Sequence, residues 1–278
     1  MISILPPDWW QFSEYSWYKM VATLSLQDPE NFEMCLDRIN WMPIGGGITN
    51  YNYKLNIGRD KYFVQLVDPN KIERLPGGRF VPVSKVIAEN NKLAFWVPEC
   101  LLDSNDIRLF SWIDAVNSKH DNFNSEIFVE KLCHFFSVLH KDISTLPFLD
   151  ITRHLETYYH LAVKYNPKRK SNFQESYKQA LKFCRSFNAS NTCHNDISPG
   201  NLLIGDEIYL VDWEYACIGD PLFDLAGVSI NFQLNEKQES YLLETYSGQL
   251  DTYFHIEKFH EMKLLYNQIT EFWESRNE

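Results

Sequence analysis

The sequence predicts an α+β protein in two parts, an antiparallel β-sheet followed by mainly helices. Three short segments between residues 41 and 67 have strand-like composition and are separated by glycine-containing turns, as in an antiparallel sheet. After about residue 114, the apolar residues recur at helical spacing. We therefore expect a first part of residues 1–113 and a second part of residues 114–278.

The first part should begin with amphipathic helical sequence and continue as a sheet. Helical sequence is expected over residues 8–40 with a break near Asp28, followed by strands over residues 41–44, 51–57 and 61–67. Residues 68–84 are rich in proline, glycine and charge, which is typical of a loop. Beyond this loop we expect a helix over residues 84–95, strands over 100–102 and 108–113, and a hinge at residues 110–113.

The second part should be helical around one β-hairpin. Helices are expected over residues 125–141, 152–165, 172–187, 222–232, 236–247 and 254–276. Two short apolar strands, residues 201–204 and 208–211, flank the turn Gly205-Asp206-Glu207. This hairpin would fold Asp212 back beside Asn201.

The composition indicates a folded, acidic protein. Of the 278 residues, 45% are hydrophobic and 15% aromatic, which supports a large core, and the net charge of −11 disfavours nucleic-acid binding. The acidic balance suits a cationic small substrate, although it also simply favours solubility. The six cysteines show neither C-x-x-C nor zinc spacing, as in a reducing compartment. With no signal-peptide pattern and no apolar run of membrane length, we expect a cytoplasmic protein without a membrane partner.

The most informative motif is the segment from His194 to Asn201, followed by Asp212, in the order H-x-D-x-x-x-x-N…D. Phosphoryl transfer needs a carboxylate that accepts the proton of the attacking hydroxyl and oxygen ligands that hold Mg²⁺ on the nucleotide phosphates. The alternative is a polar surface loop in which Asp196 and Asn201 cap turns. Four acids among apolar residues between Val211 and Ala226 argue against that alternative, because buried carboxylates are costly unless paired or metal-bound.

The segments CHNDISPGN (residues 193–201) and LVDWEYACIGDPLFDLA (residues 210–226) resemble the aminoglycoside phosphotransferase and choline kinase superfamily. They are most similar to bacterial choline kinase-like and thiamine kinase-like proteins. The resemblance implies a protein-kinase-like fold of two lobes with ATP bound in the cleft. It makes residues 1–113 the nucleotide-binding lobe and residues 114–278 the catalytic and substrate-binding lobe.

The motif residues receive definite roles. Asp196 is expected to be the catalytic base, and His194 to support it by organising the loop through hydrogen bonds. Asn201 and Asp212 are expected to be the Mg²⁺ ligands, because Mg²⁺ prefers hard oxygen donors. Glu214 would face the same side as Asp212 on a strand and could reach the metal, a water molecule or the substrate; a salt bridge or turn contact is equally open.

Other residues are expected to support the motif. Asp220 and Asp224 should cap the following helix and tie down the catalytic loop, with Asp220 as N-cap before Pro221 at N1. In the first lobe, the loop from Gly45 to Asn50 (Gly45, Gly46, Gly47, Thr49 and Asn50) resembles the GG-x-T/S-N segment of choline kinase-like proteins. It is expected to cover the phosphates, although a glycine run can also be a plain turn. Hinge residues around Phe110 and Trp112 would meet adenine.

Two positions depart from the family pattern. Gln65 stands where the family usually places a Lys or Arg that pairs with the α/β-phosphates. Either a nearby cation (Lys54, Lys61, Arg74 or Arg79) substitutes, or nucleotide affinity is reduced; Glu89 is the best acidic partner, with a poor match. Asn231 stands where choline kinase-like proteins often carry a Glu near the cationic nitrogen of the substrate.

The acceptor is expected to be a small, cationic alcohol. Ser198, Glu214, Asn231, Tyr266 and Trp273 are the predicted substrate residues, and aromatic faces there could bind a quaternary or thiazolium cation. The reading favours ATP and Mg²⁺ with a choline- or ethanolamine-like acceptor, with a thiamine kinase as the alternative. A degenerate kinase-like nucleotide-binding or regulatory protein is the alternative of another class, motivated by Gln65. The oligomeric state stays open.

Overall fold

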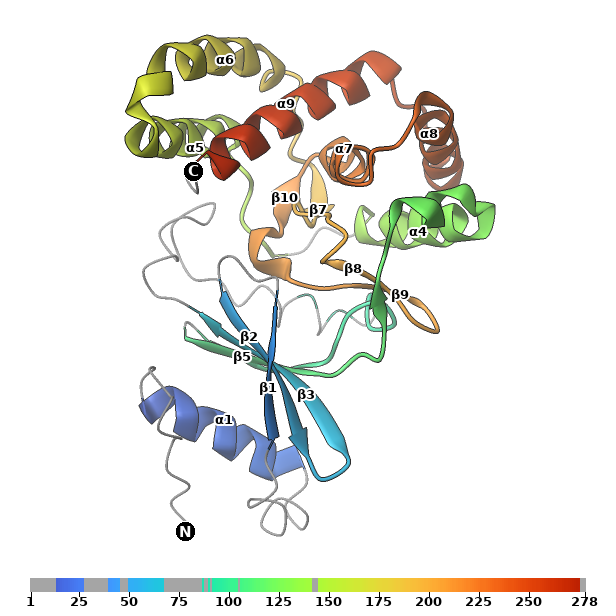
Figure 1. Cartoon of the computed structure of the whole chain (residues 1–278). Coiled ribbons are helices and arrows are strands. Elements are labelled where there is room, and N and C mark those ends of the chain that lie inside the picture. Colours follow the sequence, from blue (N-terminus) through green and yellow to red (C-terminus); the bar gives the residue numbers. More distant parts are fainter. Residues whose placement is uncertain are drawn as a thin grey trace. The chain divides into compact units, whose positions relative to one another are not determined.

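The computed structural model describes residues 14–27, 40–45, 50–67, 87, 90, 92–104, 106–141 and 145–275. The chain divides into two compact units, Met1–Asp114 and Ala115–Glu278. For the described residues, Figure 1 shows an antiparallel sheet and a helix in the first unit and mainly helices in the second. The α+β composition predicted from the sequence is therefore confirmed.

The described part of the first unit is built on one antiparallel sheet with the strand order β1-β2-β3-β5-β4. The strands are β1 (Asn40–Ile44), β2 (Asn50–Ile57), β3 (Asp60–Val67), β4 (Cys100–Asp103) and β5 (Ile107–Ser111). Each strand predicted in this region is found. The turn between β2 and β3 depends on Gly58, whose φ of 59° lies in the left-handed region that glycine enters without strain.

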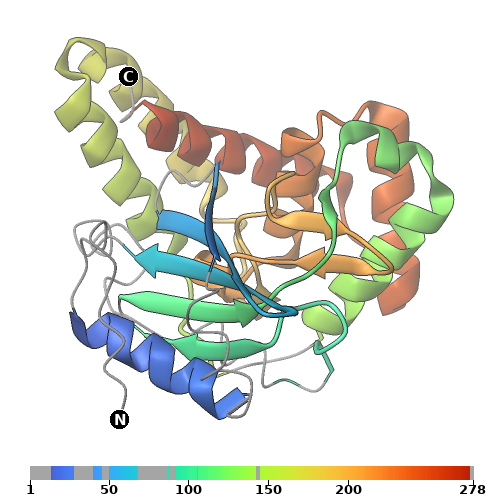
Figure 2. The same cartoon turned by 60° about the horizontal axis from the view of Figure 1, so that its bottom comes forward.

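One face of this sheet is covered by α1 (Glu14–Gln27), which Figure 2 shows running along it. Trp17, Met20 and Leu24 of α1 are buried in one apolar cluster with sheet residues. The sheet residues of this cluster are Leu55, Ile57, Val64, Leu66, Ile107 and Leu109. Because side chains alternate across a strand, the residues between them point to the opposite face.

The helix predicted over residues 84–95 is wrong for its described end. Leu93 donates its backbone N–H to the carbonyl of Asn90, and Trp96 donates to that of Leu93. These bonds span three residues and form turns through residues 92–97. Pro98 follows, and a residue before proline is biased away from helical conformation. Most of the predicted helix, with Glu89, lies outside the described residues.

The second unit contains the predicted helices. They are α4 (Glu126–Leu139), α5 (Ile151–Tyr165), α6 (Lys170–Phe183), α7 (Pro221–Asn231), α8 (Glu236–Leu250) and α9 (Ile256–Glu274). Helix α7 is buried continuously from Leu222 to Ser229 and packs against α9. A central helix of this kind is a rigid base for the loops around its first turn. Among the described residues, no helix combines the length and apolar character that a membrane span needs.

Two small antiparallel ladders carry the motif segment. β7 (Asn191–Cys193) pairs with β10 (Cys217–Gly219), and β8 (Leu202–Ile204) pairs with both β9 (Ile208–Leu210) and β6 (Val116–Asn117). Residues 194–201 therefore form the loop between β7 and β8. Residues 211–216 form the connection between β9 and β10.

Candidate active site

The hairpin predicted around residues 205–207 is confirmed, and it brings two distant motif positions together. Leu202 pairs with Leu210, and Ile204 pairs with Ile208. Just beyond these pairs, the N–H of Val211 donates to the carbonyl of Asn201 at 2.9 Å. The backbone before Asp212 is thus held against the backbone of Asn201.

Asn201 also binds Asp196 directly. Its side-chain Nδ2 donates to the Asp196 carbonyl at 2.9 Å and to the Asp196 carboxylate at 3.0 Å. The backbone N–H groups of Asn201 and Leu202 both donate to the Ser198 carbonyl. These bonds fold residues 196–202 into a tight loop, and they turn the Oδ1 of Asn201 away from Asp196.

His194 links the two halves of the motif. Its Nε2 lies 2.9 Å from the carbonyl of Val211, and the N–H of Asp196 donates to its Nδ1 at 3.2 Å. Burial lowers the pKa of His194 to about 4, so the ring is neutral at physiological pH and carries its proton on Nε2. The ring also lies against Trp213. His194 thus organises the loop by hydrogen bonds, the role expected for it.

Asp196 has the ionisation that a base at neutral pH needs. Its pKa is raised to about 7, mainly by burial and also by the nearby Glu214 carboxylate, while the Asn201 hydrogen bond opposes both effects. A general base works best when its pKa is close to the working pH.

Glu214 lies on a short helix and not on a strand. Residues Trp213–Tyr215 form a 3₁₀ helix, so the shared strand face considered for Asp212 and Glu214 does not exist. Asp212 itself adopts the left-handed conformation, with φ 62° and ψ 64°, and this turns the chain out of the strand direction. Glu214 nevertheless lies near enough to Asp196 to affect its pKa.

The loop is anchored by Asp224 in the first turn of α7. Its two carboxylate oxygens accept the backbone N–H groups of His194 at 2.8 Å and Asn195 at 2.6 Å. Asp220 is the N-cap of the same helix, accepts from Leu222, and precedes Pro221 at the first helical position. The expected capping and tying roles of these two acids are both present in the structure.

Asp224 is itself held by a buried pair that sequence reasoning missed. His140 lies with Nε2 at 3.2 Å from the Asp224 carboxylate and Nδ1 at 2.6 Å from the Tyr246 hydroxyl. Burial raises the pKa of Tyr246, so its hydroxyl keeps its proton and donates to His140. The three side chains come from separate helices and their ends, and no local pattern pointed to this contact.

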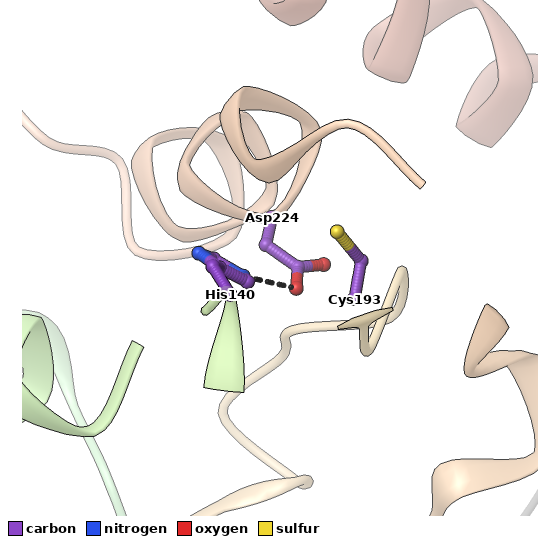
Figure 3. A group of neighbouring side chains, drawn as sticks. All are labelled: His140, Cys193 and Asp224. Carbon is purple, nitrogen blue, oxygen red and sulfur yellow. Dashed lines mark hydrogen bonds and ion pairs between the residues drawn. The ribbon is translucent and has the colours of Figure 1, made fainter. Parts of the chain in front are cut away.

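Figure 3 shows His140 and Asp224 beside Cys193. Their potential ligand atoms lie within 4.8 Å of one another, close enough to surround an ion. However, burial raises the pKa of the Cys193 thiol well above its usual value, and metals bind the thiolate. Asp224 is moreover engaged by two backbone N–H groups and His140. The cluster is therefore best explained as a structural anchor.

Asn195 and Gly219 pack closely against each other where the loop of Asp196 meets β10. Asn195 has a φ of 63°, a left-handed conformation that asparagine tolerates better than most residues. Its Nδ2 donates to the Tyr215 carbonyl at 3.1 Å. A Cβ at Gly219 would lie 2.9 Å from the Asn195 Oδ1 and 3.2 Å from the Cys193 Cβ, so only glycine fits there.

Two predicted substrate residues join this loop. Asn231 donates through Nδ2 to the Ile197 carbonyl at 2.5 Å and to the Tyr266 hydroxyl at 2.8 Å. Burial raises the pKa of Tyr266, and the Asp196 carboxylate raises it further, which places Tyr266 within electrostatic reach of Asp196. Ser198 follows Ile197 in the same loop.

Trp273 is not brought to the same point. It stands seven residues after Tyr266 on α9, about 10 Å farther along the helix. The neighbouring Phe272 packs against Tyr159 of α5 and Phe173 of α6.

The residues predicted to meet the nucleotide are only partly described. Gly46, Gly47 and Thr49 lie outside the described residues, whereas Gly45 follows β1 and the buried Asn50 begins β2. Phe110 lies in β5, where its ring meets that of Phe63. Trp112 donates its Nε1 to Asp114 at 2.8 Å, and Lys54 lies 4.0 Å from its ring centre.

The cation in contact with Gln65 is Arg108, which was not among the substitutes predicted from the sequence. Its Nη1 donates to the Gln65 Oε1 at 2.8 Å. Among the cations proposed earlier, Lys54 lies over Trp112 and Lys61 binds Asp114 at 2.9 Å. The other two, Arg74 and Arg79, lie outside the described residues.

A model of the phosphotransferase enzyme family matches residues 40–260, well over half of the chain. The chain belongs to the phosphotransferase enzyme family. The matched range includes the sheet of the first unit and the loop of Asp196, so the resemblance noted in the motif segments is confirmed.

Relatives and solved structures of this phosphotransferase family member agree on the fold. Protein LicA of Haemophilus influenzae is 42% identical over 62 residues, which are 22% of this chain and 23% of that protein. The chain thus matches less than a quarter of the length of this curated relative. The crystal structure of the choline kinase LicA from Streptococcus pneumoniae has a TM-score of 0.73 at 20% identity, covering 93% of this chain and 91% of that one. An ADP-bound aminoglycoside phosphotransferase has a TM-score of 0.59 at 15% identity, covering 90% of both chains. These structures confirm the predicted kinase-like fold class.

Gly219→Ala should damage the candidate site of this phosphotransferase family member while leaving its helices in place. The added Cβ would clash with Asn195 and Cys193, so we expect a lower melting temperature and an unfolding free energy reduced by about 1–3 kcal/mol. Thermal and urea unfolding measure this loss. The matched control is Gly248→Ala in α8, where a Cβ meets nothing within 4 Å and should be neutral or stabilising. Equal melting temperatures for the two variants would contradict the packing described here.

Proposed function

We propose that this phosphotransferase family member transfers the γ-phosphoryl group of Mg-ATP to the hydroxyl of a small, cationic alcohol of the choline or ethanolamine type. The observation that carries the proposal is the contact between Asp196 and Asn201, with the segment of Asp212 held against Asn201 by the hairpin. A carboxylate with its pKa raised to about 7 thus binds the Asn201 side chain, and the backbone just before Asp212 is held against the same residue.

The transfer step uses Asp196 as the base. An oxygen of the acceptor forms the new bond to the γ-phosphorus as the bond from that phosphorus to the β-phosphate oxygen breaks and ADP leaves. The hydroxyl proton passes to the Asp196 carboxylate. Asn201 orients this carboxylate, and His194 keeps the loop fixed by its bonds to Val211 and Asp196.

Asn201 and Asp212 fit a magnesium site. With Nδ2 of Asn201 bound to Asp196, its Oδ1 is directed elsewhere, and amide and carboxylate oxygens are the hard donors that Mg²⁺ prefers. The left-handed turn at Asp212 comes directly after Val211, whose N–H binds the Asn201 carbonyl. When bound, Mg²⁺ would neutralise charge that develops on the phosphates.

The acceptor would lie against Asn231, Tyr266 and Glu214. Asn231 and Tyr266 bind each other and the loop next to Asp196, so they form a fixed polar wall. Position 231 carries no charge in this chain, so the carboxylate proposed to attract a cation is that of Glu214, whose charge acts on Asp196. The similarity to the choline kinase LicA of Streptococcus pneumoniae supports choline over thiamine, and Ser198 remains a proposed contact, whereas Trp273 lies too far along α9.

Asp196→Asn should nearly abolish phosphorylation, because it removes the proton acceptor and keeps the side-chain size. We expect the turnover number to fall roughly 10²- to 10⁴-fold. The assay measures ADP release with Mg-ATP and choline, ethanolamine or thiamine in turn. Asp206→Asn, an exposed position in the hairpin turn, is the control and should retain activity. Near wild-type turnover of Asp196→Asn would sink the kinase proposal. Product from no acceptor and no stabilisation by Mg-ATP would favour the regulatory alternative.

Glu214→Gln should move the pH profile to lower pH. Asp196 must be ionised to accept a proton, so kcat/KM for the acceptor rises with pH through the Asp196 pKa and then levels off. Glu214 raises that pKa by like-charge repulsion, and its removal lowers the pKa. Profiles of kcat/KM between pH 5 and 9 would show the shift of the rising limb. An unshifted limb, or a shift to higher pH, is incompatible with this coupling.

Tyr266→Phe should weaken acceptor binding more than nucleotide binding. The variant loses the hydroxyl that receives the Asn231 hydrogen bond, so the KM for the acceptor should increase roughly 2- to 10-fold. Steady-state kinetics with each substrate varied in turn separates the two KM values. Tyr253→Phe, whose side chain is 76% exposed, is the control and should be silent. An unchanged acceptor KM would remove Tyr266 from the proposed acceptor wall.

A further inference from the structure

Three neighbouring strands of the first unit bring together one buried polar cluster. Arg108 of β5 is the direct cross-strand partner of Gln65 in β3 and of Asp103 in β4. Its Nη1 donates to the Gln65 Oε1 at 2.8 Å, and its Nε lies 3.3 Å from the Asp103 carboxylate. Arg108 is only 4% exposed and Gln65 only 3%, so the cluster is part of the interior.

The cluster lies on the face of the sheet that α1 does not cover. The neighbours of Gln65 and Arg108 along their strands are Val64, Leu66, Ile107 and Leu109, which pack into the apolar cluster with α1. Strand alternation therefore directs Gln65 and Arg108 to the other face. Phe63 and Phe110, two residues along the same strands, form a ring pair on that face with centroids 6.1 Å apart. Two residues of a strand span about 6.6 Å, so a charged group and an aromatic pair lie side by side.

Arg108 is distinguished from the other cations of this unit. The basic residues that the structure describes there are Lys19, Lys54, Arg59, Lys61, Lys92 and Arg108. Of these, only Arg108 is buried. It is also the one in contact with Gln65, the position where the related proteins usually carry the cation of strand β3.

The burial of this charge needs an explanation beyond stability. A buried ion pair costs much of its Coulomb energy in desolvation, and well-packed apolar residues often stabilise a fold as well or better. A guanidinium presents its N–H donors in a planar fork, and this geometry matches phosphate oxygens. Asp103 compensates the charge, and Gln65 orients the fork.

We infer that Arg108 is the cation that contacts the α/β-phosphates of the nucleotide, oriented by Gln65 from β3 and Asp103 from β4. The inference rests on the proposed function, since it assumes that the first unit binds ATP. Position 65 then needs no positive charge, because the neighbouring strand supplies it. The acidic partner is likewise supplied by a strand, so the poor match at Glu89 loses its importance. The uncharged Gln65 is then the residue that accepts a hydrogen bond from Arg108 and orients it.

The test compares ligands with and without phosphates. Calorimetric titrations with adenosine, AMP, Mg-ADP and Mg-ATP are run on wild type, Arg108→Gln and the double variant Gln65→Lys/Arg108→Gln, which returns the cation to β3. For Arg108→Gln we expect Mg-ADP and Mg-ATP to bind roughly 10- to 100-fold more weakly, with adenosine unchanged. The double variant should regain most of the lost affinity. Arg59→Gln, in the exposed turn between β2 and β3, is the control and should bind like wild type.

Folding damage is separated from lost phosphate binding by a second double variant. Arg108→Gln leaves Asp103 buried without its cation, whereas Arg108→Gln/Asp103→Asn removes both charges together and should melt closer to wild type. It should still bind Mg-ADP as weakly as Arg108→Gln does. The inference would be overturned if Arg108→Gln or Arg108→Gln/Asp103→Asn bound Mg-ADP with wild-type affinity, or if either lost as much affinity for adenosine as for Mg-ADP. The proposed function would stand in both cases. Failure of the wild-type protein to bind any nucleotide would overturn both.

Discussion

The candidate site depends on one buried carboxylate, that of Asp224. Its oxygens accept hydrogen bonds from the backbone N–H groups of His194 and Asn195. It also contacts His140, whose Nδ1 accepts a hydrogen bond from the Tyr246 hydroxyl. An isolated charge in this interior would be costly, but hydrogen bonds from fixed donors offset the cost. Because Asp224 belongs to α7, the loop that carries Asp196 is attached to a helix that is buried continuously from Leu222 to Ser229.

From that anchor, a closed series of hydrogen bonds determines the geometry of the motif. His194 joins Val211, Val211 joins Asn201, and Asn201 joins Asp196, whose own N–H returns to His194. Each bond restricts the next, so the orientation of the Asp196 carboxylate is fixed by the loop. Its burial, together with the charge of Glu214, raises its pKa to about 7. The fold that positions this carboxylate therefore also sets its ionisation.

The sequence predicted this site where the determining contacts are local. The hairpin and the return of Asp212 to Asn201 follow from a turn between two apolar strands, and the cap at Asp220 follows from the proline after it. The contacts of His140 with Asp224 and of Arg108 with Gln65 could not be predicted, since they join residues 84 and 43 positions apart and depend on packing and register. Glu214 lies on a 3₁₀ helix and not on a strand, because Asp212 adopts a left-handed conformation. Aspartate permits this conformation but does not require it, so the sequence could not predict it. The burial of Arg108 could not be predicted either, because charged residues are usually exposed and nothing in the local sequence distinguishes Arg108 from them.

The proposed transfer step depends most directly on the ionisation of Asp196. Its most direct test is a ¹³C NMR titration of the Asp196 side-chain carboxyl in the folded wild-type protein, with the signal assigned by its absence in Asp196→Asn. The account predicts a titration near pH 7, because burial and Glu214 both disfavour the charged form. A titration near pH 4, the ordinary value for an exposed aspartate, would show that the loop does not enclose Asp196 and would contradict the account.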